Sequence, residues 1–181
     1  AAAIANNTSS YGATGANSVV IGRLSKASGA DSFAIGDNNI AGNGDAFALG
    51  NTNNVTGGGT AFAIGANHTV SGTLAACIGG STSTATQTYA MTFGPYAKGG
   101  MYILYADTTD ATAEALTTTN STAGSTNQIV AASDTCIMFS GTIVAMQNGA
   151  ADQGGWEIRG LLKNDGGTTT LVNSEVKTFA D

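Results

Sequence analysis

The chain has 181 residues, of which 42% are hydrophobic and only 10% are charged, and its formal net charge is −6. The six Lys and Arg residues are spread along the sequence without forming a basic patch, which argues against a nucleic-acid-binding protein. No stretch approaches 18 consecutive apolar residues, so we expect no transmembrane helix.

A short motif repeats six times between residues 17 and 94. The clearest copies read Asp31-Ser-Phe-Ala-Ile-Gly36, Asp45-Ala-Phe-Ala-Leu-Gly50 and Thr60-Ala-Phe-Ala-Ile-Gly65. The closing glycines stand at positions 22, 36, 50, 65, 79 and 94, so one period is 14 or 15 residues long. A second motif, such as Val55-Thr-Gly57, lies between successive copies. Each period therefore contains two short strands and two turns.

This period is too short for a helical hairpin, because helical repeats need about 33 residues. Two strands of about four residues and two tight turns make one coil of a β-solenoid, in which coils stack about 4.8 Å apart. Recurrent glycines suit its corners, where the chain needs a positive φ or a close backbone approach. The sequence predicts a β-roll of about six coils in residues 1–99.

The central strand of each repeat is apolar on both sides. Phe33 and Ile35 point one way and Ala34 the other, although a strand with one wet face should alternate apolar and polar residues. One side can face the interior of the coil, and the other predicts contact with another copy of the chain. The Asn-rich pieces between the strands predict an outer wall. The predicted interface of this homo-oligomer, most simply a trimer, comprises Phe33, Ala34, Ile35, Phe47, Ala48, Leu49, Phe62, Ala63 and Ile64.

The sequence of residues 31–65 resembles the head repeat of trimeric autotransporter adhesins, the YadA-like repeat, which is also found in bacteriophage tail fibres. The resemblance covers about residues 11–99. It implies a left-handed parallel β-roll that forms a homotrimer.

From Met101 onward the periodicity disappears and longer, unequal strands are predicted, at residues 101–106, 111–116, 127–132, 135–148, 155–163 and 168–179. In the fifth of these, Trp156, Ile158 and Leu162 alternate with charged residues. Asn164-Asp165-Gly166-Gly167 is a strong hairpin signal. The sequence predicts an antiparallel, jelly-roll-like β-sandwich in residues 100–181. We expect this sandwich to be incomplete on its C-terminal side: either the sequence is a fragment, or a neighbouring chain fills the open edge.

This second part is similar to a C-terminal domain of many phage tail fibres. The similarity is carried by Thr108–Thr112, by the aromatic strand and Gly-Gly-Thr-Thr turn of Trp156–Thr169, and by Val176–Thr178. In that family further strands follow the last of these segments. The resemblance implies a virion tail fibre, and therefore an extracellular location.

Few residues have side chains that suggest catalysis or metal binding. The single histidine, His68, is expected to be exposed in a turn. Cys77 and Cys136 are expected to be separate, buried free thiols, with a disulfide or redox pair as the alternative. The separation of these three residues argues against a metal site within one chain. The run from Ala41 to Asp45 does not match a calcium-binding β-roll motif, so we expect no metal or cofactor.

Asp152 and Glu157 flank Trp156 and form the best candidate for a sugar-binding site. The alternative places Trp156 in the sandwich core, with Glu157 paired to Arg159 outside. A glycan-cleaving enzyme needs two carboxylates across a groove. Most of the 12 acidic residues fall at predicted turns, where a capping role explains them, so the sequence does not predict an enzyme.

Our leading hypothesis is a structural and receptor-recognition segment of a trimeric phage tail fibre. It would bind a host cell-surface glycan or protein without catalysis, through the loops at residues 107–126 and 147–155, and could join further fibre subunits end to end. One alternative is a self-assembling extracellular filament or a bacterial surface adhesin subunit. A glycan depolymerase tailspike is the other.

Overall fold

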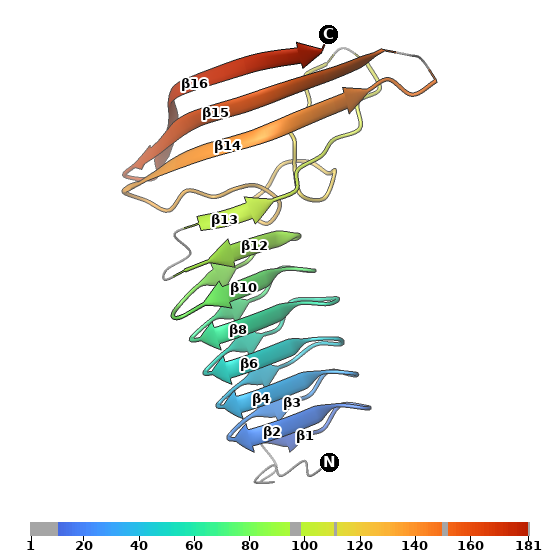
Figure 1. The fold of residues 1–181 in the computed structure, drawn as a ribbon, viewed down its shortest axis with the longest axis vertical. Coiled ribbons are helices and arrows are strands. Elements are labelled where there is room, and N and C mark those ends of the chain that lie inside the picture. Colours follow the sequence, from blue (N-terminus) through green and yellow to red (C-terminus); the bar gives the residue numbers. More distant parts are fainter. Residues whose placement is uncertain (1–10, 95–98, 111, 150–151, 181) are drawn as a thin grey trace. The chain divides into compact units, whose positions relative to one another are not determined.

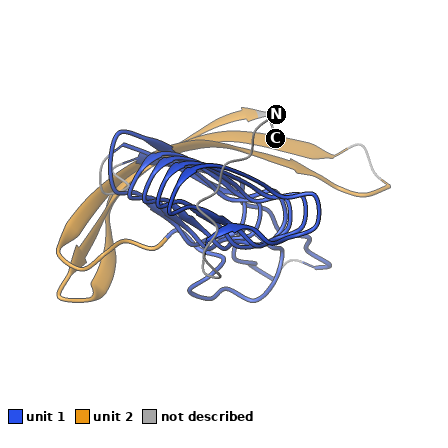
Figure 2. Ribbon diagram, turned by 90° about the horizontal axis from the view of Figure 1, so that it is seen from below, with its two compact units in different colours: residues 1–129 blue, residues 130–181 orange. Residues whose placement is uncertain are grey.

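A computed structural model of the chain describes residues 11–94, 99–110, 112–149 and 152–180, and in these residues it is all-β without a helix. A β-solenoid is followed by an antiparallel sheet, as the sequence predicts (Figure 1). The chain divides into two compact units, residues 1–129 and residues 130–181 (Figure 2). Residues 1–10, the start of the region predicted to form the β-roll, lie outside the described residues.

The solenoid consists of two parallel sheets. The first contains six strands of four or five residues: β2 (Val19–Arg23), β4 (Phe33–Asp37), β6 (Phe47–Asn51), β8 (Phe62–Ala66), β10 (Ala76–Gly79) and β12 (Ala90–Phe93). The second contains six two-residue strands: β1 (Gly12–Ala13), β3 (Lys26–Ala27), β5 (Ile40–Ala41), β7 (Asn54–Val55), β9 (Thr69–Val70) and β11 (Thr84–Ala85). The predicted six coils are therefore confirmed.

Strand β13 (Gly99–Tyr102) pairs antiparallel with β12 and covers the C-terminal edge of the first sheet. This strand spans the boundary between residues 99 and 100 that the change in periodicity predicts.

The core of the solenoid is made of small side chains. Equivalent residues of successive coils stack on one another, so that Ala34 pairs in register with Ala48, and Ala48 with Ala63. Both sheets contribute to a single buried cluster that runs along the stack, which includes Val20, Ala27, Ala34, Ala41, Ala48, Val55, Ala63, Val70, Cys77 and Ala85. Since alanine and valine dominate, the two strands of one coil enclose a thin but continuous core.

In the first four coils, the closing glycine leaves room for the backbone of the next coil. Gly50 has φ 123°, a conformation that L-residues rarely adopt. A Cβ atom at this position would lie 1.9 Å from the carbonyl oxygen of Gly65 in the next coil. The same clash occurs at Gly22, Gly36 and Gly65. The glycine repeat is therefore set by how closely successive coils approach one another as well as by φ.

Between β13 and residue 129 the chain is mostly irregular. The strand predicted at residues 101–106 ends at Tyr102, and those predicted at 111–116 and 127–132 are wrong, since only an isolated bridge joins Tyr105 to Thr117. The side-chain amide of Asn127 donates to Thr119 Oγ1, Ser121 Oγ and the Thr122 carbonyl oxygen. Such local side-chain hydrogen bonds compete with strand pairing.

The second unit contains one three-stranded antiparallel sheet, formed by β14 (Thr135–Met146), β15 (Gln153–Asp165) and β16 (Thr168–Ala180). The predicted hairpin is confirmed, because Gly166 and Gly167, both with positive φ, connect β15 to β16. The prediction of a two-layered sandwich is wrong for the described residues, which form a single layer. The other strands predicted for this region, at residues 101–106, 111–116 and 127–132, are not part of this sheet.

Candidate interaction surfaces

The outward side of the long-strand sheet carries a continuous apolar stripe. Phe33 stacks on Phe47 with ring centroids 6.3 Å apart, and 39% of Phe33 remains exposed. The register places the same kind of residue at both outward positions of nearly every coil. We define the outer stripe as Val19, Ile21, Phe33, Ile35, Phe47, Leu49, Phe62, Ile64, Ile78, Met91 and Phe93.

The predicted interface residues divide between two environments. Phe33, Ile35, Phe47, Leu49, Phe62 and Ile64 all belong to the outer stripe. Ala34, Ala48 and Ala63 are fully buried inside their own coils, where they form the core of the single chain. Only the six large residues are therefore available to a neighbouring molecule.

A buried polar ladder runs along one corner of the solenoid, formed by Ser25, Asn39, Asn53, His68 and Ser83. Each side chain accepts the backbone N–H of the next member; Asn53 N–H donates to Asn39 Oδ1 at 3.0 Å, for example. Each side chain also faces the closing glycine carbonyl of the next coil, as Asn53 Nδ2 does by donating to Gly65 O at 2.9 Å. The Asn-rich pieces expected to form an outer wall thus turn part of their side chains inward.

His68 was expected to be exposed in a turn, and this prediction is wrong, since the side chain is 0% exposed. Its Nδ1 accepts the backbone N–H of Ser83 at 3.0 Å, which places the ring proton on Nε2, 3.0 Å from the Gly79 carbonyl oxygen. The imidazole therefore makes the two contacts that the asparagines make in earlier coils. Alignment of the coils would have revealed this role, because His68 occupies the ladder position of Asn53.

The two cysteines lie in different surroundings. Cys77 takes the place of the core alanine and is buried, as expected, with its Sγ 3.0 Å from Thr92 Oγ1. Burial raises the pKa of the Cys77 thiol, against a smaller lowering by hydrogen bonds from Thr92 and Ala85. The expectation that Cys136 is buried is wrong, because it lies exposed on β14. Both thiols are free.

The proposed sugar site is not assembled as the sequence suggests. In β15, Trp156 pairs across the sheet with Ile143, whereas Glu157 pairs with Thr142, so their side chains point to opposite faces. Asp152 lies before the strand and is exposed. The alternative pairing of Glu157 with Arg159 is also wrong, since Arg159 Nε binds Glu175 Oε2 at 2.9 Å and this carboxylate raises the pKa of Arg159.

The described residues offer few groups for catalysis or metal binding. A shallow depression beside Cys136 is lined by Asp134, Lys163 and Asp165, but Lys163 Nζ is already paired with Asp165 Oδ2 at 2.8 Å. Within residues 11–94, 99–110, 112–149 and 152–180, no group of three His, Cys, Asp or Glu side chains could hold a metal ion. The same residues contain no helix with the length and apolar character needed to cross a bilayer.

Comparison with protein families identifies part of the solenoid. Residues 13–39, which span β1 to β4, match the YadA head domain repeat in two copies. Comparisons with curated proteins and with solved structures found no match. The matched repeats show that this part of the solenoid is similar to an adhesin head repeat.

Proposed function

We propose that this chain forms a homotrimeric extracellular segment that mediates attachment, with the solenoid as a stiff spacer and without catalysis. The decisive observation is the outer stripe, which is apolar over six coils on a sheet whose inner side is already filled. A strand with two apolar faces needs two partners, and the coil supplies only one. The match to an adhesin head repeat supports a second copy as the other partner.

The outer stripe can offset the cost of association. Full burial of a Phe, Leu or Ile side chain stabilises by about 1.5–3 kcal/mol. Four of the eleven stripe residues are 37–48% exposed and the other seven less, so each contributes about 1 kcal/mol or less when covered. Three protomers together supply up to about 30 kcal/mol, and the two association steps of a trimer cost roughly 8–30 kcal/mol.

Recognition in this proposal belongs to the exposed loops at residues 107–126 and 147–155, and its ligand is a cell-surface glycan or protein. Asp107 and Asn120 hold the first loop together, because Asn120 Nδ2 donates to Asp107 Oδ2 at 2.6 Å. Three copies of a weak site on one rigid stalk raise the overall affinity through effective concentration. We place the segment in a phage tail fibre, on the resemblance of both parts of the sequence to such fibres.

The trimer is tested by a matched pair of substitutions. Ile64 in the outer stripe and Ile40 on the opposite sheet are each 37% exposed. Ile64→Asp would bring three carboxylates together in an apolar interface and should yield monomers, whereas Ile40→Asp should leave the trimer intact. Sedimentation velocity should report three times the 17.8 kDa chain mass for the unmodified protein. A monomeric unmodified protein, or equal dissociation of both variants, would refute the trimer.

Recognition requires its own test. The labelled trimer should bind host cells or a glycan array and lose affinity when the loop at residues 107–126 is replaced by a short Gly-Ser linker. If the intact trimer binds no cell surface, the segment has a structural role only. Electron micrographs showing concentration-dependent polymers would favour the second candidate, a self-assembling filament, which the open edges of the three-stranded sheet support.

A further inference from the structure

The three-stranded sheet of the second unit has two unpaired edges. Its order is β14-β15-β16, and in the described residues neither β14 nor β16 pairs with a further strand. None of the 12 residues of β14 is charged. Exposed edge strands in soluble proteins are normally protected by charges, prolines or a covering element. A long edge strand without charge therefore indicates a partner strand in the native assembly.

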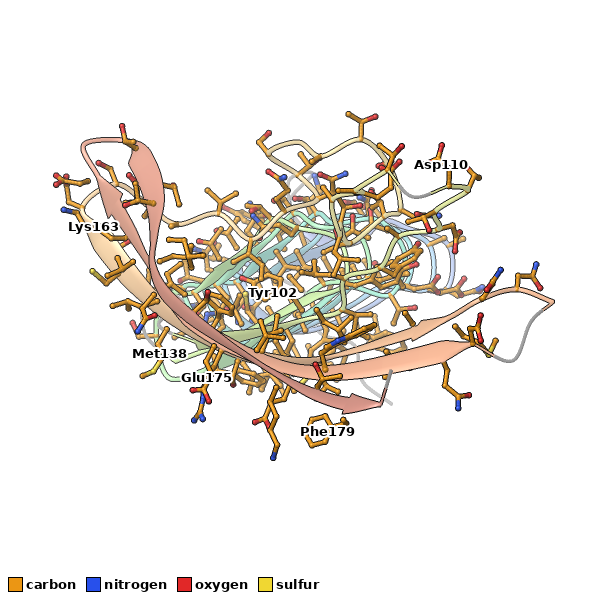
Figure 3. All side chains as sticks on the ribbon, turned by 90° about the horizontal axis from the view of Figure 1, so that it is seen from above. Tyr102, Asp110, Met138, Lys163, Glu175 and Phe179 are labelled. Atoms are coloured by element: carbon orange, nitrogen blue, oxygen red, sulfur yellow. The ribbon has the colours of Figure 1, made fainter. Side chains whose placement is uncertain are left out.

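The two faces of this sheet differ in charge. The register puts Glu157 opposite Lys177 and Arg159 opposite Glu175, so that these residues share one face with Lys163. Met138, Lys163 and Glu175 project from this same outer side of the curved sheet (Figure 3). We call it the charged face. The other side, the charge-free face, carries Ile137, Phe139, Ile143, Trp156, Ile158, Leu162, Leu171 and Val176.

Glycines beneath aromatic rings allow the charge-free face to curve inward. A Cβ atom on Gly160 would lie 2.6 Å from the ring of Phe139 on the neighbouring strand. A Cβ atom on Gly154 would lie 2.1 Å from the indole of Trp156. The pairing of β15 with β16 also shifts register at Gly155/Trp156 and at Leu161/Leu162. Glycines and bulges of this kind introduce the bending that a closed barrel requires.

We propose that three copies of this sheet close into a single nine-stranded barrel, in which β16 of each copy pairs with β14 of the next. This inference rests on the proposed trimer. Rotation about a threefold axis preserves strand direction along that axis, and β14 and β16 run the same way within a sheet. The new pairing is therefore parallel. A contact between two different edges closes into a ring when the rotation is cyclic.

The dimensions and the chemistry of the sheet suit this closure. A barrel of about eight strands has an interior just wide enough to be filled by side chains, and nine strands are close to that size. The charge-free face supplies Phe139, Trp156 and Ile158 for that interior, and the charged face remains in water. Closure removes both edges of every sheet. A closed barrel also leaves no edge free for a further chain, so it excludes growth into a filament through this sheet.

Cys136 provides a natural probe for the new contact. It is exposed at the start of β14, and its place opposite Lys163 puts it on the charged face. We would introduce one cysteine at a time at charged-face positions of β16, in the full chain: Thr168→Cys, Thr170→Cys, Asn173→Cys, Glu175→Cys and Lys177→Cys. Within one chain, β15 separates these positions from Cys136 by about 9.6 Å. A disulfide needs Cα atoms about 4.4–6.8 Å apart, so any bond formed must join two chains.

Mild oxidation followed by non-reducing electrophoresis should give covalent dimers and trimers at one or two adjacent positions only. The charge-free-face variants Thr169→Cys and Ser174→Cys should form no bond, and neither should any variant that also carries Cys136→Ser. If sedimentation shows a trimer but no charged-face position cross-links, the barrel is refuted while the trimer stands. A ladder of products beyond the trimer would also overturn it, because an open chain of sheets is then present. A monomer in sedimentation refutes both proposals.

Discussion

The solenoid and the three-stranded sheet use opposite kinds of residues and reach opposite degrees of burial. The solenoid strands are two to five residues long and carry mostly alanine and valine inward, yet they form one continuous buried core. The strands of the sheet are 12 or 13 residues long and carry Phe, Trp, Ile and Leu, yet Asn164 alone is buried among their described residues.

The difference shows that the number of packed layers determines how far side chains are buried more than the size of those side chains does. Each solenoid coil supplies two walls and the next coil closes the gap, so even an alanine is removed from water. The sheet supplies one wall, and Val176 on its charge-free face remains 61% exposed. The first unit therefore completes its core within one chain, whereas the second leaves its large apolar side chains partly exposed.

The largest expected effect contrasts a glycine from each region. Gly50→Ala places a methyl group 1.9 Å from the Gly65 carbonyl oxygen, at a φ that alanine avoids, and should destabilise the solenoid by about 3 kcal/mol or more. Gly141→Ala in β14 meets only an ordinary contact, 3.8 Å from Ile158 Cγ1, and should be neutral or slightly stabilising. Thermal unfolding followed by circular dichroism measures both. Equal tolerance of the two changes would show that coil spacing does not require the glycine.

A smaller effect is expected in the polar ladder. Asn53→Ala leaves the Gly65 carbonyl and the His68 N–H without partners in a buried corner and should cost about 2–3 kcal/mol. The neighbouring Asn54→Ala removes a side chain that makes no hydrogen bond in the described structure and should change stability by less than about 0.5 kcal/mol.

His68→Asn belongs to the same test, because it restores the residue found in earlier coils and should cost less than about 1 kcal/mol. Hydrogen exchange of the solenoid amides should show protection lost only with Asn53→Ala. A His68→Asn variant as unstable as Asn53→Ala would argue that the imidazole has a role of its own.

The smallest expected effect is a loss of solenoid stability at alkaline pH. Burial raises the pKa of Cys77 above its ordinary 9.0. Burial, and to a smaller extent the charge of the nearby Cys77, raises the pKa of Tyr102 above its ordinary 10.0. The unfolded chain therefore releases these protons at lower pH than the folded chain does. The stabilisation is complete below about pH 9 and is lost as pH rises through the folded pKa values.

The melting temperature should accordingly fall as the pH rises from about 8 to about 10.5. Cys77→Ala, which restores the core alanine of earlier coils, should flatten this dependence, and Tyr102→Phe should flatten it as well. Melting curves with identical slopes for all three proteins would contradict the assignment.

Sequence periodicity was sufficient to predict the solenoid, because every coil has the same pattern of inward-facing and outward-facing residues. It failed where a residue was considered without its coil, as with His68. In the second unit, alternation along β15 correctly separated Trp156 from Glu157, and Gly166-Gly167 fixed the hairpin. The missing second layer could not be foreseen, because threonine favours strands in isolation, whereas the side chain of Asn127 holds an irregular loop in the folded chain.

The polar ladder has a consequence for how such a molecule can change its reach. Serine, asparagine and histidine all fit its rungs, and each rung contacts only the coils directly above and below. A segment of 14 or 15 residues can therefore be duplicated or deleted in frame with the stack, lengthening or shortening the rod by about 4.8 Å each time. The length of the solenoid can therefore evolve in steps of one coil.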